Sequence, residues 1–548
     1  MTEQRFEQRF WQQLYDPGQP GEIRQEFGDM LSVFRDAVRQ RPDMPAILYF
    51  DGSLSFSEVD KVSDQMARAF IDNGLGAGDR LLMVMQNVPQ FVLVLIAAWK
   101  VGAIVVPANP MYKSKEFEFV LEDCEPTIVV LQDEFYRAVG KDVTEKHGVG
   151  KVYVTSEAFF QGESDPRVFG DTPSGAGCPE FMEEVSPLPA GDIPVIELTD
   201  TDTATIVYTS GTTGKPKGAM HSHGNLSFNA QVSREWLRME PGEPNLAIAP
   251  LFHITGLVGN LCSALLAGSP LVLYRRFVPD MVLDEIRRHK PVFTVAPITA
   301  LIALMNVPGV KPGDFESFRL VLSGGAPVPP AVRDALREKL GIVVRNAYGM
   351  TETSATVTVT PLQYEGPVDP KYGALSIGVP VFNTDIRIVD DQGKEVSAGE
   401  EGELLIKGPQ VISGYWRRPE DQSIVDGWIS TGDIATVDKD GWVYLIDRKK
   451  DMIIASGYKV WPRDVEDVLY THPQVREVAV VPARDDYRGE TVRAVVSLTE
   501  GATVTSDELI DYCKERLAAY KYPRVVDIID DLPKTPTGKI LRRALKET

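Results

Sequence analysis

The sequence has few cysteines, an excess of negative charge and no long hydrophobic run, and each of these features argues against a class of protein. The four cysteines show neither disulfide nor metal-binding spacing, which fits a reducing compartment. The formal net charge is −21, which argues against a general nucleic-acid binder because nothing broad would neutralise phosphates. An anionic ligand would therefore need local positive groups.

Membrane insertion and secretion are also disfavoured. The most apolar run, residues 91–98, is followed by Lys100 and stopped by Pro107, so it is too short for a bilayer and predicts a buried helix. The first residues are polar and lack a signal-peptide core. We expect a soluble cytoplasmic protein. Peripheral membrane contact and a homodimer stay open.

What the sequence does contain is a concentrated glycine- and hydroxyl-rich segment. Residues 209–218 read Thr-Ser-Gly-Thr-Thr-Gly-Lys-Pro-Lys-Gly and follow an apolar run typical of a strand. Glycines admit a bulky ligand close to the backbone, hydroxyls donate hydrogen bonds, and Lys215 and Lys217 add positive charge, so the loop suits a polyphosphate. Pro216 stands where a Walker loop would need its second glycine, so this is a different pattern.

The pattern along the chain predicts an α/β protein with more than one domain. The polar residues up to about 29 predict a loosely attached arm, and alternating helices and strands over 30–134 predict a parallel sheet covered by helices. Residues 156–194, rich in Gly, Pro, Ser and acids, predict an exposed insertion with little functional content. Alternation resumes after the loop as far as residue 341, and short strands over 376–444 predict a small β-rich subdomain.

Five consecutive charged residues at 447–451 separate two differently patterned regions, so we place a domain boundary there. The expected fold class is a large N-terminal domain, residues 1–449, of stacked α/β subdomains plus the β-rich subdomain. A small, mobile α+β C-terminal domain, residues 450–548, follows. In it, Pro462 begins a helix, and Thr505 with Glu508 predicts a capping box.

Six motifs occur in a fixed order, at residues 209–218, 348–353, 430–434, 447–451, 457–459 and 533–540. Together they resemble the AMP-forming, adenylate-forming superfamily, which includes acyl- and aryl-CoA synthetases, firefly luciferase and peptide-synthetase adenylation domains. The resemblance implies a two-step reaction. A carboxylate attacks the α-phosphorus of ATP to give acyl-AMP and pyrophosphate, and a thiol, usually coenzyme A, then displaces AMP.

The resemblance also implies site residues. Lys539 would neutralise charge between the carboxylate and the α-phosphate, Glu352 would bind Mg²⁺, and Thr351 would contact phosphate. Tyr348 would lie against adenine, Asp433 would accept the ribose hydroxyls, and Arg448 would contact ribose or phosphate. The full expected set of ATP- and AMP-binding residues is Thr209, Ser210, Gly211, Thr212, Thr213, Gly214, Lys217, Gly324, Gly325, Ala326, Asn346, Tyr348, Gly349, Asp433 and Arg448.

The acid substrate is less sharply indicated. His253 stands where amino-acid-activating domains carry an aspartate for the α-ammonium, so amino acids are disfavoured. The expected acyl pocket comprises His253, Gly256, Leu257, Gly325 and Gly349, with Gly256 and Gly349 leaving room. Residues 426–450 resemble the signature of fatty-acid ligases, which favours a medium- to long-chain fatty acid. An aryl or arylalkanoic acid, transfer to a carrier protein, and a non-catalytic nucleotide binder are the alternatives.

The resemblance finally implies motion of the small domain. After adenylation it would rotate about the hinge residue Lys450 and exchange the Lys539 loop for residues Gly457, Tyr458 and Lys459, which would line the channel for coenzyme A.

This hinge assignment makes a prediction. Lys450→Pro restricts the backbone at the hinge, so the variant should form acyl-AMP at the wild-type rate but fail to form the thioester. Each half-reaction is measured separately, by pyrophosphate release and by acyl-CoA formation from a supplied acyl-AMP. Equal loss of both would contradict the hinge.

Overall fold

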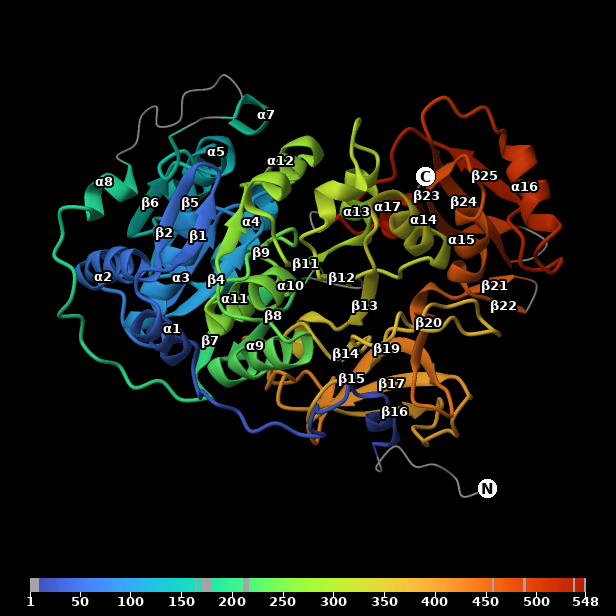
Figure 1. Cartoon of the computed structure of the whole chain (residues 1–548), viewed down its shortest axis with the longest axis horizontal. Coiled ribbons are helices and arrows are strands. Elements are labelled where there is room, and N and C mark those ends of the chain that lie inside the picture. The colour runs from blue at the N-terminus through green and yellow to red at the C-terminus, as the bar shows by residue number, and fades with distance from the viewer. Residues whose placement is uncertain are drawn as a thin grey trace.

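The computed structural model describes residues 9–162, 165–169, 180–209, 216–455, 458–485, 489–535 and 538–546. Figure 1 shows helices and two large sheets on one side, a β-rich part below, and a small unit containing the C-terminus at the upper right. The helices are α1 (Met30–Gln40), α2 (Phe56–Asp72), α3 (Pro89–Val101), α4 (Ser114–Cys124), α5 (Asp133–Phe135), α6 (Lys141–Lys146), α7 (Pro166–Phe169), α8 (Phe181–Val185), α9 (His223–Leu237), α10 (Ile254–Gly256), α11 (Ser263–Ala267), α12 (Pro279–His289), α13 (Ile298–Met305), α14 (Pro330–Leu340), α15 (Pro462–Tyr470), α16 (Ser506–Lys514) and α17 (Arg542–Lys546).

Two mainly parallel sheets form the large body, as the alternating pattern predicts. The six-stranded sheet has the order β6 (Lys151–Thr155), β5 (Ile128–Gln132), β3 (Arg80–Val84), β4 (Ile104–Ala108), β7 (Thr203–Tyr208) and β8 (Gly218–Ser222). The nine-stranded sheet has the order β15 (Val379–Pro380), β14 (Thr358–Val359), β13 (Val344–Tyr348), β12 (Leu320–Ser323), β11 (Phe293–Ala296), β9 (Asn245–Leu246), β10 (Leu271–Leu273), β1 (Pro45–Tyr49) and β2 (Gly52–Ser55).

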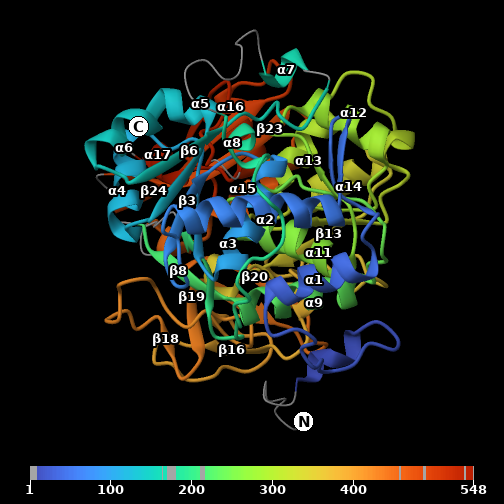
Figure 2. The same ribbon diagram turned by 90° about the vertical axis from the view of Figure 1, so that its left-hand side faces the viewer.

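Helices pack between and over these sheets (Figure 2). Helix α2 begins with a Ser55–Glu58 capping box and buries Val59, Met66 and Phe70, the face expected from their spacing. Every side chain of α3 is buried, and Pro89 begins it. One hydrophobic core contains residues of both sheets and of these helices, so the two sheets are held as one body. Within the described part of the chain, no helix combines the length and apolarity needed to cross a bilayer.

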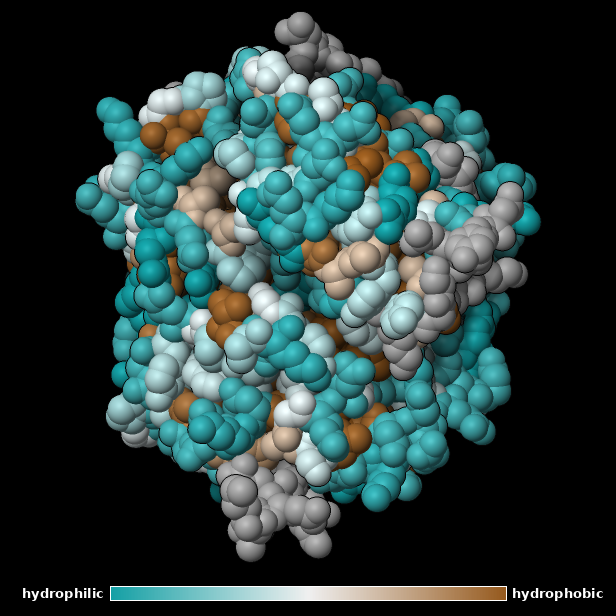
Figure 3. Space-filling model, turned by 90° about the vertical axis from the view of Figure 1, so that its right-hand side faces the viewer, coloured by the Kyte–Doolittle hydropathy of each residue, from teal (hydrophilic) through white to brown (hydrophobic). Residues whose placement is uncertain are grey.

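The remaining two sheets lie later in the chain. An antiparallel sheet has the order β16 (Asp385–Val389), β17 (Gly402–Lys407), β19 (Trp428–Val437) and β18 (Ile424–Val425), with β20 (Val443–Arg448) paired to β19. It is the β-rich subdomain expected over 376–444. The last sheet has the order β22 (Tyr458–Val460), β21 (Ile453–Ala455), β24 (Gly489–Leu498) and β23 (Val475–Asp485), with β25 (Val525–Ile528) paired to β24. It has its own core with α15 and α16. Figure 3 shows this end of the molecule as mostly hydrophilic with separate apolar patches.

The loosely attached arm predicted at the N-terminus is wrong for residues 9–29. Trp11 is fully buried, and Gly441 packs against its backbone so closely that an added Cβ would lie 2.5 Å from Trp11 Cα. The Tyr15 hydroxyl donates to the carbonyl of Pro380 at 2.7 Å, and the Asp16 carboxylate accepts two backbone N–H groups from 362–363. This segment is therefore fastened both to the β19–β20 turn of the β-rich subdomain and to the β14–β15 end of the nine-stranded sheet.

The exposed insertion predicted over 156–194 is wrong in part. Residues 163–164 and 170–179 lie outside the described residues, but α8 buries Phe181 and Met182 against the large body. The Phe181 ring lies 4.1 Å from that of Tyr153 and 5.9 Å from that of Phe70. Burial of these aromatic side chains makes α8 part of the core.

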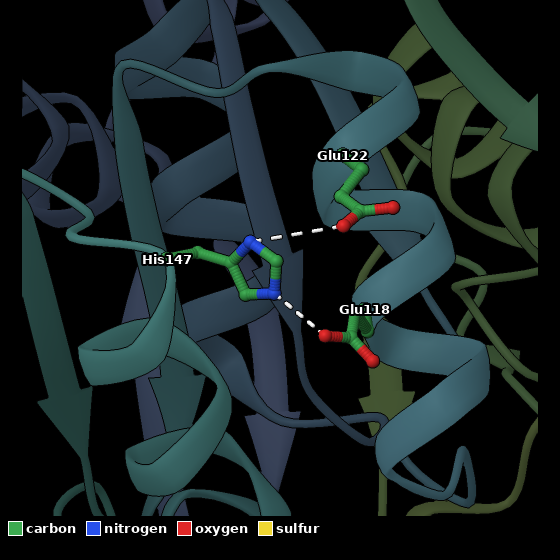
Figure 4. A group of neighbouring side chains, drawn as sticks. All are labelled: Glu118, Glu122 and His147. Carbon is green, nitrogen blue, oxygen red and sulfur yellow. Dashed lines mark hydrogen bonds and ion pairs between the residues drawn. The ribbon is translucent and has the colours of Figure 1, made fainter.

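An ion-pair cluster fixes the end of α6 against α4 (Figure 4). His147 Nε2 lies 2.8 Å from a Glu118 oxygen, and its Nδ1 lies 3.8 Å from a Glu122 oxygen. Lys146 also pairs with Glu118. Each ring nitrogen of His147 faces a different carboxylate of α4, so these contacts hold the end of α6 against α4.

The burial of Trp11 predicts that the N-terminal segment contributes stability. Trp11→Ala should lower the unfolding free energy by about 3–5 kcal/mol, because a large buried aromatic side chain is lost. Thermal unfolding of the full chain measures this as a lower Tm, with Gln13→Ala, an exposed position of the same segment, as control. An unchanged Tm for Trp11→Ala would contradict the packing role.

Candidate active site

The carboxyl ends of parallel strands β9, β11, β12 and β13 lie at one edge of the nine-stranded sheet. This is the edge at which open α/β sheets bind ligands. The segments that leave these strands begin at residues 247, 297, 324 and 349, and they contain the expected site residues at 253–257, 324–326 and 349–352. The topology therefore gathers residues that are far apart in the sequence.

Asp433, Arg448 and Tyr348 form a connected group beside this edge. Asp433 on β19 and Arg448 on β20 are cross-strand partners, with Arg448 Nε 3.3 Å from Asp433 Oδ1. The Tyr348 hydroxyl at the end of β13 donates to Asp433 Oδ2 at 2.7 Å. Burial raises the pKa of the Asp433 carboxyl, while Arg448 and Tyr348 oppose that rise. The group joins the nine-stranded sheet to the β-rich subdomain.

Lys539 reaches the same place from the C-terminal end of the chain. An added Cβ on Gly325 would lie 2.8 Å from Lys539 Cε, and Gly325 has a φ of +82°. The Thr299 hydroxyl donates to the carbonyl of Gly538 at 3.0 Å and fixes the neighbouring backbone. Burial, and next Arg448, lower the pKa of the Lys539 ammonium to about 8, while Asp433 and Glu352 act to raise it. The lysine therefore shares one electrostatic environment with these carboxylates.

Glu352 lies in a short 3₁₀ turn, Thr351–Thr353, directly after β13. The hydroxyl of Tyr415 donates to Glu352 Oε1 at 2.8 Å. Lys217 Nζ lies 4.9 Å from the centre of the Tyr415 ring and 2.6 Å from Asp421 Oδ2. Tyr415 thus links the carboxylate expected to hold Mg²⁺ with a lysine expected at the phosphates. The sequence analysis missed Tyr415 and Asp421, because neither belongs to the six motifs.

His253 caps the short helix α10, where its Nδ1 accepts the backbone N–H of Thr255 at 3.3 Å. Burial, and then the nearby Lys539, lower the pKa of His253 to about 3, so the imidazole is neutral near pH 7. With Nδ1 accepting, the neutral ring carries its one proton on Nε2, where it can donate a hydrogen bond to a carboxylate but is too weakly acidic to act as a general acid. A π-helix, Leu257–Cys262, follows α10, and Leu257 is fully buried in the core.

The expectation that Gly256 and Gly349 leave room for an acyl chain is wrong. A Cβ added at Gly256 would lie 2.2 Å from the carbonyl oxygen of Pro250, and one added at Gly349 would lie 1.4 Å from that of Ala355. Backbone fills both spaces. These glycines permit close approach of neighbouring chain segments, and they do not open a cavity.

The other expected residues are placed as follows. Asn346 is buried and donates to the carbonyl of Ser376, Gly324 packs near the carbonyl of Ala347, and Ala326 is partly exposed. The Thr209 backbone N–H donates to the Lys217 carbonyl at 2.9 Å. Lys450 is exposed in a 3₁₀ turn, and exposed Tyr458 stacks on Tyr520. Ser210, Gly211, Thr212, Thr213, Gly214 and Gly457 lie outside the described residues, and Lys459 is described only as backbone of β22.

Comparisons with known proteins agree with the motifs. A family model described as "AMP-binding enzyme" matches residues 34–416, and one described as "AMP-binding enzyme C-terminal domain" matches residues 464–539. A long-chain-fatty-acid–CoA ligase of Bacillus subtilis (strain 168) is 33% identical over 98% of both chains.

Solved structures show the same relationship. ATP-bound MatB from Rhodopseudomonas palustris has a TM-score of 0.82 and 28% identity, covering 94% of this chain and 98% of its own. The anthranilate CoA ligase AuaEII, in complex with anthranoyl-AMP, has a TM-score of 0.84 and 27% identity, covering 96% and 97%. The chain therefore belongs to the AMP-binding enzyme family, the adenylate-forming superfamily that its motifs resemble.

Proposed function

We propose that this protein, an AMP-forming acid–CoA ligase, activates a medium- to long-chain fatty acid with ATP and transfers the acyl group to coenzyme A. The observation that carries the proposal is the position of Lys539. The Lys539 ammonium comes from the end of the chain, lies against Gly325 and interacts electrostatically with Arg448, Asp433 and Glu352 of the large body. The full-length similarity to a long-chain-fatty-acid–CoA ligase supports the choice of acid.

In the first half-reaction the acid's carboxylate attacks the α-phosphorus, an O–P bond forms, and the bond to the β-phosphate breaks to release pyrophosphate. Both reactants are anionic, so positive charge must be placed before they meet. We assign this to Lys539, with Lys217 at the outer phosphates and Asp433 at the ribose hydroxyls. Neutral His253 would orient the attacking carboxylate.

A magnesium ion fits the same site. Glu352 offers a hard carboxylate oxygen that is partly exposed, and the Tyr415 hydroxyl on its other oxygen fixes the orientation of the group. Bound there, Mg²⁺ would screen the phosphate charge. Thr351, next to Glu352 in the turn, would contact phosphate.

In the second half-reaction the thiol of coenzyme A attacks the acyl carbonyl, a C–S bond forms and AMP leaves. Lys539 lies against Gly325 in this structure, whereas Tyr458 is exposed and stacks on Tyr520 of the small domain. We therefore assign the structure to the adenylating orientation. We further propose that the domain formed by residues 450–548 rotates about Lys450 to bring residues 457–459 to the acyl-adenylate.

An aryl or arylalkanoic acid is the second candidate substrate. AuaEII, named as an anthranilate CoA ligase, has nearly the same fold over most of both chains. Because backbone atoms occupy the space beside Gly256 and Gly349, these two glycines do not favour a fatty acid over an aryl acid as the substrate. The choice of acid therefore needs a direct test.

The lowered pKa of Lys539 predicts a basic limit to adenylation. The pKa of Lys539 is about 8, so the ammonium is charged at lower pH and neutral at higher pH. The kcat/KM for pyrophosphate formation should therefore fall as the pH rises through about 8. Pyrophosphate release is followed between about pH 6 and pH 10, with Lys539→Arg as control because guanidinium stays charged there. An identical fall in that variant would assign the limit to another group.

A panel of carboxylic acids tests the function. Fatty acids of increasing length and aryl acids are each scored for AMP formation with and without coenzyme A. We expect CoA-dependent AMP release, greatest for medium or long fatty acids. Greater turnover of aryl acids would reverse the substrate choice, and AMP release that ignores coenzyme A would favour a carrier-protein acceptor. Absence of pyrophosphate with every acid would contradict catalysis.

A further inference from the structure

We propose that Arg542 is a positioning residue for Lys539, and that its ion pair with Asp447 holds the small domain in the adenylating orientation. This inference rests on the proposed function and adds a specific anchor to it. Arg542 lies three residues after Lys539, at the start of α17, and faces carboxylates from both parts of the protein.

On one side Arg542 is fixed to the small domain. Its Nη2 donates to both oxygens of Glu466 on α15, at 2.8 and 2.7 Å. The Glu466 side chain also accepts the backbone N–H of Val480 at 2.8 Å, which ties it to β23. A guanidinium that contacts both oxygens of a carboxylate has a defined orientation. Arg542 must therefore move with α15 as one unit.

The backbone between Lys539 and Arg542 is paired with residues 533–535. Lys534 and Ile540 form an antiparallel bridge, the Thr535 N–H donates to the Lys539 carbonyl at 2.6 Å, and the Leu541 N–H donates to that of Pro533 at 2.7 Å. The backbone that joins Lys539 to Arg542 therefore has little conformational freedom. Where Arg542 is held, the Lys539 backbone is held too.

On the other side Arg542 reaches across the proposed domain boundary. Its Nη1 lies 3.4 Å from Asp447 Oδ1, and Asp447 belongs to β20, which pairs with β19 beside Asp433. The Asp447 side chain is only 5% exposed, so its charge is poorly solvated and a cationic partner matters. Asp447 Oδ2 also accepts the backbone N–H of Arg463, and Arg463 Nη1 donates to the Leu445 carbonyl at 2.7 Å.

These contacts can exist in only one orientation. Asp447 and Leu445 lie before Lys450 and stay with the β-rich subdomain, whereas Arg463, Glu466 and Arg542 lie after it. A rotation about Lys450 would keep the Arg542–Glu466 pair but separate Arg542 from Asp447. Asp451, with Lys546 Nζ at 3.1 Å, lies beside the hinge and adds a third carboxylate, 3.8 Å from Arg542. The Asp447–Arg542 pair therefore biases the domain toward the orientation that delivers Lys539.

The test separates the two half-reactions. Arg542→Gln and Asp447→Asn should each slow pyrophosphate release roughly tenfold, as expected for loss of a charged hydrogen bond. Acyl-CoA formation from a supplied acyl-AMP should stay at the wild-type rate or rise. Arg543→Gln is the matched control, because Arg543 is exposed on the same helix and should change neither step.

A double-mutant cycle decides whether the two residues act together. If they do, Arg542→Gln combined with Asp447→Asn should be no slower in adenylation than the slower single variant. Asp447→Asn keeps the Arg542–Glu466 pair, so it carries the test if Arg542→Gln fails to fold. Equal loss in both half-reactions, no loss in either, or additive losses would overturn the inference. Failure of the wild-type enzyme to release pyrophosphate with any acid would instead overturn the proposed function.

Discussion

The contact on which the site depends is the approach of the Lys539 ammonium to the backbone at Gly325. A Cβ at position 325 would lie 2.8 Å from Lys539 Cε and would displace the end of the lysine side chain, and the φ of +82° independently favours glycine. Removing the ammonium from water lowers its pKa, and Asp433 and Glu352 offset part of that penalty. The contact therefore couples two carboxylates of the large body to the segment that precedes α17.

Contacts within the large body fix the orientation of the Asp433 carboxylate that interacts with Lys539. Strand pairing sets Asp433 opposite Arg448, and the Tyr348 hydroxyl holds the other carboxylate oxygen. The N-terminal segment contributes at a distance, because Trp11 and Tyr15 fasten the subdomain that contains Asp433 to the rest of the body. A polar, irregular stretch of sequence thus supports the geometry of a site to which it contributes no residue.

The features of the fold and site that could be predicted from the sequence are those set by local residue patterns and by motifs. The alternating helices and strands after the glycine-rich loop were predicted from their pattern, and α14 (Pro330–Leu340) is one of these helices. The fastened N-terminal segment could not be predicted, since its contacts join residues more than 340 positions apart. Helix α8 has only five residues, which is too short for a helical hydrophobic periodicity to be recognised in the sequence. Tyr415 carried no signal because its importance comes from a neighbour, Glu352, remote in the sequence.

The turn after Glu352 shows why the glycines were misinterpreted. Ser354 and Ala355 have φ values of +47° and +87°, which are unfavourable for residues with side chains. The Asn229 amide donates to the carbonyls of Thr353, Ser354 and Thr356, at 3.3, 2.7 and 3.2 Å, and so holds the turn in this strained form. This turn also places the carbonyl oxygen of Ala355 where a Cβ of residue 349 would lie. Glycine at 349 therefore follows from the close approach of the Ala355 carbonyl in the turn that carries Glu352.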